Sequence, residues 1–171
     1  MTIFGISGSM ALMLVGFGLR DSIMDIARRQ YQELQHYTGT IIDYEDATDK
    51  ERQELDEFLK NNSQIERYTH VQFTKMSVPR NKSNISVYVY VPENLETFNK
   101  DVTLQDRKTK EKYKLTEAGT VISEKTATLT GLKVGDTMTI TKDGKNYETK
   151  IAAVTENYMG HYIYFTPQYY K

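Results

Sequence analysis

The first stretch of the chain constrains its fold more than any other, because residues 3–19 (IFGISGSMALMLVGFGL) contain no charged side chain. A helix over these residues would extend ~25 Å, just short of the ~30 Å hydrocarbon core of a bilayer. Its small residues lie at spacings typical of paired membrane helices: Gly5, Ser7, Gly8, Ser9 and Ala11. We therefore expect residues 1–19 to form a transmembrane helix.

This stretch has two alternative interpretations. A secretory signal peptide requires a positive leading region and a small-residue cleavage site, and only Met1 and Thr2 precede the apolar run. A buried core helix is the second alternative, although the run is longer than the 10–14 residues usual for one. Membrane anchors commonly carry Lys or Arg near their cytoplasmic end, and none precedes this run. We therefore expect a piece of a longer protein, cut within its first membrane helix.

Residues 20–37 are predicted to continue this helix as a stalk. They contain no Pro or Gly, and Gly39 follows as a stop signal. Apolar side chains recur every three or four residues, which gives a helix one apolar seam: Ile23, Ile26, Ala27, Tyr31 and Leu34. The same pattern also fits a surface helix packed on its own domain.

Residues 38–171 have the pattern of an α+β domain with a mixed sheet and a few short helices. The clearest strand is 85–91 (ISVYVYV), in which Val alternates with Tyr or Ser. A capping box at Thr48 and Glu51 predicts a helix to residue 61, and Asp143-Gly144 predicts a type I′ hairpin. Further strands are expected at 40–45, 65–78, 120–123, 137–141 and 161–165, a turn at 79–84, a hairpin at 102–115, and helices at 92–99, 124–129 and from Thr166 onward.

Composition and motifs argue against several functional classes. The net charge is −1, which does not favour nucleic-acid binding. The chain has no Cys, and its three histidines (His36, His70 and His161) are far apart, so no metal-ligand spacing is present. No phosphate-binding loop or nucleophile motif occurs. We therefore expect no catalytic residues, no cofactor and no metal.

Two segments in the second half of the chain resemble a known family. GTVISEKTA at 119–127 and LTGLKVGDTMTI at 129–140 are similar to the extracytoplasmic core domain of FtsX-like ABC-transporter permeases of the MacB type. Residues 2–23 look like the first membrane helix of such permeases and its exit into the stalk, and residues 161–170 resemble the strand before a further helix. Such permeases are several times longer, so the resemblance implies a fragment that is cut short at its C-terminus and lacks the segments that contact the ATPase.

The resemblance implies a non-catalytic domain on the extracytoplasmic face of the cell membrane. In such permeases a separate cytoplasmic ATP-binding subunit hydrolyses ATP, and the stalk transmits the motion outward. The implied partners are the membrane, this subunit, the rest of the permease, and a peptide, lipid or protein ligand. The implied roles are export, lipid or peptide handling, or signalling. On this basis the stalk residues expected to carry the coupling are Ile23, Ile26, Tyr31 and Leu34.

The Gly-Asp segment is predicted to have a structural role. Gly131 is placed to close the short helix before it. Gly135, followed by Asp136, lies where a tight turn requires a residue that tolerates positive φ. We therefore assign Gly131, Gly135 and Asp136 to a turn.

Other functional classes stay open at this stage. An extracytoplasmic sensor or adhesion module anchored by one helix fits the same pattern, and an enzyme would require a cleft with perturbed titratable groups. Arg20, Arg28 and Arg29 follow the apolar run. If Met1 were the natural start, the positive-inside rule would place the domain in the cytoplasm. The extracytoplasmic placement therefore depends on the resemblance.

Overall fold

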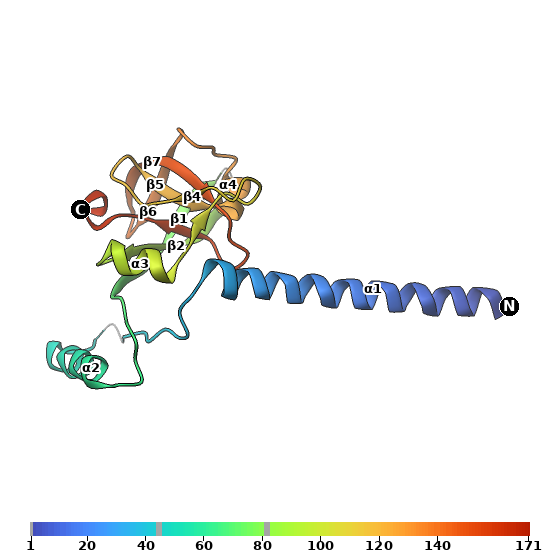
Figure 1. Ribbon diagram of the computed structural model, residues 1–171. Coiled ribbons are helices and arrows are strands. Elements are labelled where there is room, and N and C mark those ends of the chain that lie inside the picture. The colour runs from blue at the N-terminus through green and yellow to red at the C-terminus, as the bar shows by residue number, and fades with distance from the viewer. Residues whose placement is uncertain (1, 44–45, 81–82) are drawn as a thin grey trace.

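A computed structural model describes residues 2–43, 46–80 and 83–171, and shows a helical rod that projects from a small β-barrel (Figure 1). Helix α1 (Thr2–Arg28) continues into the π-helix η1 (Arg29–Leu34). The amide of Gln35 donates to the carbonyl oxygen of Gln30 at 2.9 Å, the five-residue spacing of a π-helix. The backbone of Gln35 is extended, so the rod ends there.

Along α1, the side chains from Ile6 to Met24 are exposed on all sides of the helix. This exposure rules out the alternative of a buried core helix. A transmembrane helix was expected at residues 1–19, but no helix in the described ranges is long and apolar enough to cross a membrane.

The chain contains both helices and strands, as expected for an α+β protein, but its main sheet closes into a six-stranded barrel. The strand order is β1-β2-β8-β5-β7-β6, and the strands are β1 (Val71–Arg80), β2 (Ser83–Pro92), β5 (Thr120–Ser123), β6 (Thr137–Lys142), β7 (Lys145–Thr155) and β8 (Tyr162–Tyr164). Neighbours β2/β8 and β5/β7 are parallel, and the other pairs are antiparallel. Pairing of Ser77 with Thr141 joins β1 to β6 and closes the barrel, which corrects the expectation of an open mixed sheet.

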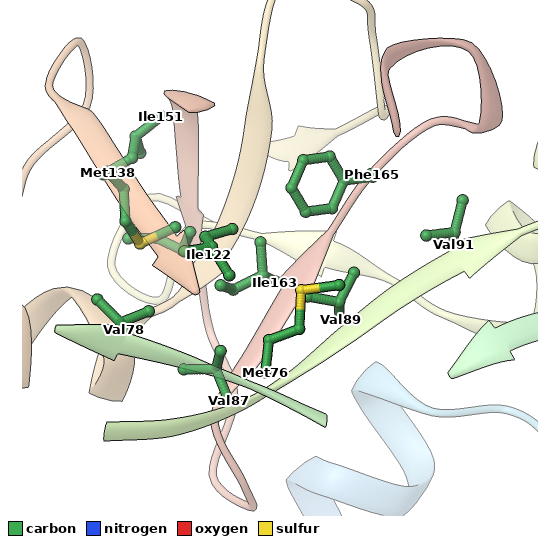
Figure 2. Close-up of a cluster of buried hydrophobic side chains, with 11 residues drawn as sticks. Met76, Val78, Val87, Val89, Val91, Ile122, Met138, Ile151, Ile163 and Phe165 are labelled. Atoms are coloured by element: carbon green, nitrogen blue, oxygen red, sulfur yellow. The ribbon is translucent and has the colours of Figure 1, made fainter. Parts of the chain in front are cut away.

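The barrel interior is filled by apolar side chains from all six strands and by Phe165, which follows β8 (Figure 2). On β2, Val87, Val89 and Val91 point inward and are at most 5% exposed, as the alternation predicts. Tyr88 and Tyr90 lie on the outer face of the same strand. There Tyr90 packs with Phe98 of helix α3 (Leu95–Asp101) in a second buried cluster.

Most of the shorter elements agree with the sequence analysis. The expected hairpin at 102–115 contains β3 (Leu104–Gln105) and β4 (Lys112–Tyr113). Helix α4 spans Glu124–Thr130, and Thr166 caps α5 (Pro167–Tyr170). Asp143 and Gly144 both have positive φ, as a type I′ turn requires.

The segment before the barrel differs most from the expectation. Helix α2 (Asp49–Asn61) begins at the capping box of Thr48 and Glu51, and it lies apart from the barrel (Figure 1). The strand expected at 40–45 is wrong for residues 40–43, which have no strand partner, while 44–45 lie outside the described residues. Residues 65–70 also precede the first strand, and the turn expected at 79–84 is largely part of the β1–β2 hairpin, with 81–82 outside the described residues.

Candidate functional site at the junction of stalk and barrel

A buried glutamine joins the helical rod to the barrel. Gln30 lies in η1 and is only 1% exposed. Its Nε2 donates to Asn157 Oδ1 at 2.9 Å, and its Oε1 accepts from the backbone amide of Tyr158 at 2.9 Å. Both partners follow β7 at the end of the barrel. Two directional hydrogen bonds from one side chain fix the rotation of the rod about its own axis.

The last turn of the rod also pairs with the backbone after α3. Leu34 is 2% exposed, and its carbonyl oxygen accepts from the amide of Thr103 at 2.8 Å. The amide of His36 donates to the carbonyl oxygen of Asp101 at 2.8 Å, and Gln35 forms a β-bridge with Val102. The rod is therefore held at two separate places, one after β7 and one after α3.

A buried carboxylate lies beside this junction. Glu156 is 2% exposed and is contacted by Lys110 Nζ at 2.7 Å, Tyr158 Oη at 2.6 Å and Gln105 Nε2 at 2.8 Å. Burial raises the pKa of the Glu156 carboxyl, but hydrogen bonds from Lys110, Tyr158 and Gln105 outweigh burial and leave this pKa below its ordinary value. The carboxylate therefore stays ionised and ties the β3–β4 hairpin to the segment that binds Gln30.

Ion pairs cover the exposed side of the rod near the junction. Asp25 accepts from Arg28 at 2.8 Å and from Arg29 at 2.7 Å, and Arg28 also pairs with Glu33 at 2.9 Å. The hydrogen bonds from Arg28 and Arg29 lower the pKa of Asp25. These groups are exposed, so they add little stability, but they cover the point where α1 passes into η1.

The four predicted coupling residues lie in different environments. Leu34 is buried in the junction, and Tyr31 lies at its edge, where its hydroxyl is 3.1 Å from Met159 Sδ. Ile23 and Ile26 are 56% and 41% exposed and lie farther along the rod. The barrel contacts the rod only near its end. Leu34 and Tyr31 therefore contact the barrel, whereas Ile23 and Ile26 are exposed to solvent.

Gln30, Glu156 and Asn157 were not identified from the sequence. Gln and Glu are exposed in most proteins, so nothing in their spacing indicates burial. Glu156 and Asn157 follow the β7 strand directly, and this placement after a strand is the one signal that the sequence carries for them.

The predicted turn residues lie between α4 and β6. Gly131 ends α4 with φ of +76°, and Gly135 has φ of +95°. The amide of Gly135 donates to Ile151 O at 2.8 Å, and Asp136 Oδ2 accepts from the amide of Lys133 at 2.8 Å. Their contacts are with the backbone of the turn and of β7, which is a structural arrangement.

Within the described ranges, no group of three or more His, Asp or Glu side chains is placed to hold a metal ion. The sequence matches no protein-family model and no curated protein.

Proposed function

We propose that this chain is a non-catalytic extracytoplasmic domain of an FtsX-like, MacB-type ABC-transporter permease in the cell membrane. In this proposal a cytoplasmic ATP-binding subunit drives movement of the membrane part of the permease. The rod carries this movement to the barrel, and the barrel serves export, peptide or lipid handling, or signalling.

The observation that supports this proposal most is the buried attachment of Gln30. A rod attached only by exposed side chains would slip or rotate against the barrel. Hydrogen bonds to Asn157 and Tyr158, together with the buried Leu34, instead make the rod and barrel move as one body. Mechanical transmission requires such a fixed attachment.

The exposed apolar surface of α1 is the second support. Its large apolar side chains between Ile6 and Met24 are 56–75% exposed. A continuous exposed apolar surface marks a contact site. In the proposal, helices from the rest of the permease cover them.

Cross-linking in the intact membrane protein tests the proposal. The chain has no natural Cys, so Ile23→Cys provides a unique thiol on the exposed side of the rod. We expect it to cross-link to another helix of the permease, with a yield that changes when ATP is added. Glu148→Cys, on an exposed part of β7, is the matched control and is expected to give no ATP-dependent cross-link.

The same experiment separates the proposal from a single-helix sensor or adhesion module. A sensor would purify without an ATP-binding subunit, and its Ile23→Cys cross-links would be indifferent to ATP. Either result would contradict the permease proposal.

A further inference from the structure

The described residues 37–43 and 46–69 form an arm that leaves the barrel and returns to it (Figure 1). Asp101 holds the arm at both ends: its carbonyl oxygen accepts from His36 N at 2.8 Å, and its carboxylate accepts from Arg67 Nε at 2.7 Å and Thr69 Oγ1 at 3.1 Å. Between these ends the arm carries α2, which stands apart from the barrel (Figure 1). None of the described residues of α2 is buried. The arm is therefore fixed at its base and exposed in its middle.

The arm has a hollow whose lining is half apolar and half charged: the apolar residues are Ile41, Ile42, Ala47 and Leu55, and the charged ones are Asp43, Asp46, Glu51 and Arg52. The hollow has a volume of about 470 Å³ and lies between the segment after His36 and the first turns of α2. Ile41 and Ile42 line it and are 63% and 78% exposed, and Leu55 of α2 contributes a third apolar side chain. Exposing the side chains of two adjacent isoleucines to water costs free energy. Their exposure therefore indicates a surface that another molecule covers.

The surroundings of the hollow are acidic. Between Asp46 and Glu57 the sequence has six acidic residues and two basic ones, Lys50 and Arg52. Lys50 lies 3.6 Å from Glu54, and Arg52 lies 3.7 Å from Asp43, so both cations already face an acid. The acidic excess repels nucleic acids and anionic lipid surfaces and attracts cations.

From this combination we infer that the arm binds a basic, amphipathic polypeptide segment. Apolar side chains of the segment contact Ile41, Ile42 and Leu55. Its Lys or Arg side chains pair with Asp46 and compete with Arg52 for Asp43, because the exposed Arg52–Asp43 pair is long at 3.7 Å. An apolar stripe that is flanked by basic residues is complementary to this surface in both respects.

This inference is independent of the proposed function, because the residues that line the hollow contribute nothing to the stalk junction. Loss of peptide binding at the arm would leave the permease proposal intact. A stalk without ATP-dependent cross-links would equally leave the arm as a binding surface.

Hydrogen exchange on the full chain tests the inference with a defined probe. The probe is a synthetic helical peptide with Leu on one face and Lys on the other, added to the protein in a non-ionic detergent. We expect slower amide exchange in residues 46–58 and an affinity that falls as salt is raised. Ile41→Ser/Ile42→Ser is expected to weaken binding at least tenfold, and Asp43→Asn/Asp46→Asn to weaken it several-fold and reduce its salt dependence.

Matched controls distinguish binding at this surface from non-specific binding of the peptide. Val134→Ser/Glu148→Gln removes an exposed apolar side chain and an exposed acid from the barrel, and it is expected to bind the probe like the wild type. A peptide with Glu in place of Lys is expected not to protect the arm. Equal protection by the Leu/Glu peptide, protection confined to residues 6–24, or absence of protection would each overturn the inference.

Discussion

The side-chain nitrogen of Gln30 lies 2.9 Å from the side-chain oxygen of Asn157, across 127 residues of sequence. Both residues are buried, so water does not compete for this contact. The π-helical turn places Gln30 against the barrel, and π-helical turns occur frequently at functional sites. The contact therefore couples an irregular helix end to the barrel by a polar interaction.

Replacing Gln30 by Ala removes both hydrogen bonds and leaves Asn157 and the Tyr158 amide without their partner. Each buried unsatisfied group costs about 1–3 kcal/mol, so we expect Gln30→Ala to lower the free energy of unfolding by about 2–5 kcal/mol. Urea denaturation followed by circular dichroism measures this. Gln53→Ala, on the exposed surface of α2, is expected to change it by less than about 0.5 kcal/mol. Equal stability of the two variants would show that Gln30 does not hold the rod.

Glu156→Gln tests the buried carboxylate through pH. The pKa of Glu156 in the folded protein is below its ordinary value, so its contribution to stability is complete above about pH 4.3 and is lost as pH falls through the lowered pKa. We expect the variant to be less stable than the wild type by about 1–3 kcal/mol at pH 7. The difference should shrink as pH falls below about 4.3. Denaturation at several pH values, with Glu148→Gln as the exposed control, measures it. A difference that stays constant down to acidic pH would contradict the assignment.

The sequence predicted local elements better than their long-range relations. Val87, Val89 and Val91 follow a period of two, and their burial was predictable from that pattern alone. Closure of the barrel depends on Ser77 pairing with Thr141, which are 64 residues apart and carry no recognisable signal.

The misplaced strand at 40–45 has a related cause. Ile41 and Ile42 have the propensity of a strand, but the arm carries them away from the barrel, and no described strand lies beside residues 40–43. At the site, Leu34 was found from helical spacing. Gln30 was not, because its burial depends on where the barrel meets the rod.

Gly135→Val tests the turn before β6. A Cβ at Gly135 would meet no atom within 4 Å, so any cost comes from its φ of +95°, which a β-branched residue adopts only with strain. We expect a loss of about 1–3 kcal/mol in the free energy of unfolding. Gly39→Val is the matched control, since its Cβ also enters open space and its φ is not in the positive range. Unchanged thermal stability of Gly135→Val would refute the turn assignment.

Deletion of residues 1–19 tests whether the apolar part of α1 belongs to the folded unit. The described side chains of this part are exposed, and the rod contacts the barrel only from about Gln30 onward. We expect the shortened chain to fold as a monomer with an unfolding midpoint within about 2 °C of the full chain, a change within the range of a surface substitution. Circular dichroism and sedimentation measure both quantities. Unfolding or aggregation of the shortened chain would show that these residues complete the core.

Asp101→Asn tests how the arm is attached. The substitution preserves the shape of the side chain but removes the negative charge that Arg67 contacts at 2.7 Å. Because hydrogen bonds to charged groups contribute about 1.5–3 kcal/mol, amides at 67–70 should exchange roughly tenfold faster or more in the variant, while amides in β2 and β5 should keep their rates. Glu96→Gln removes the exposed partner of Lys100 on the same helix and is expected to change neither set. Faster exchange throughout the barrel would instead mean that Asp101 stabilises the whole domain, and the arm would then have no separate attachment at this residue.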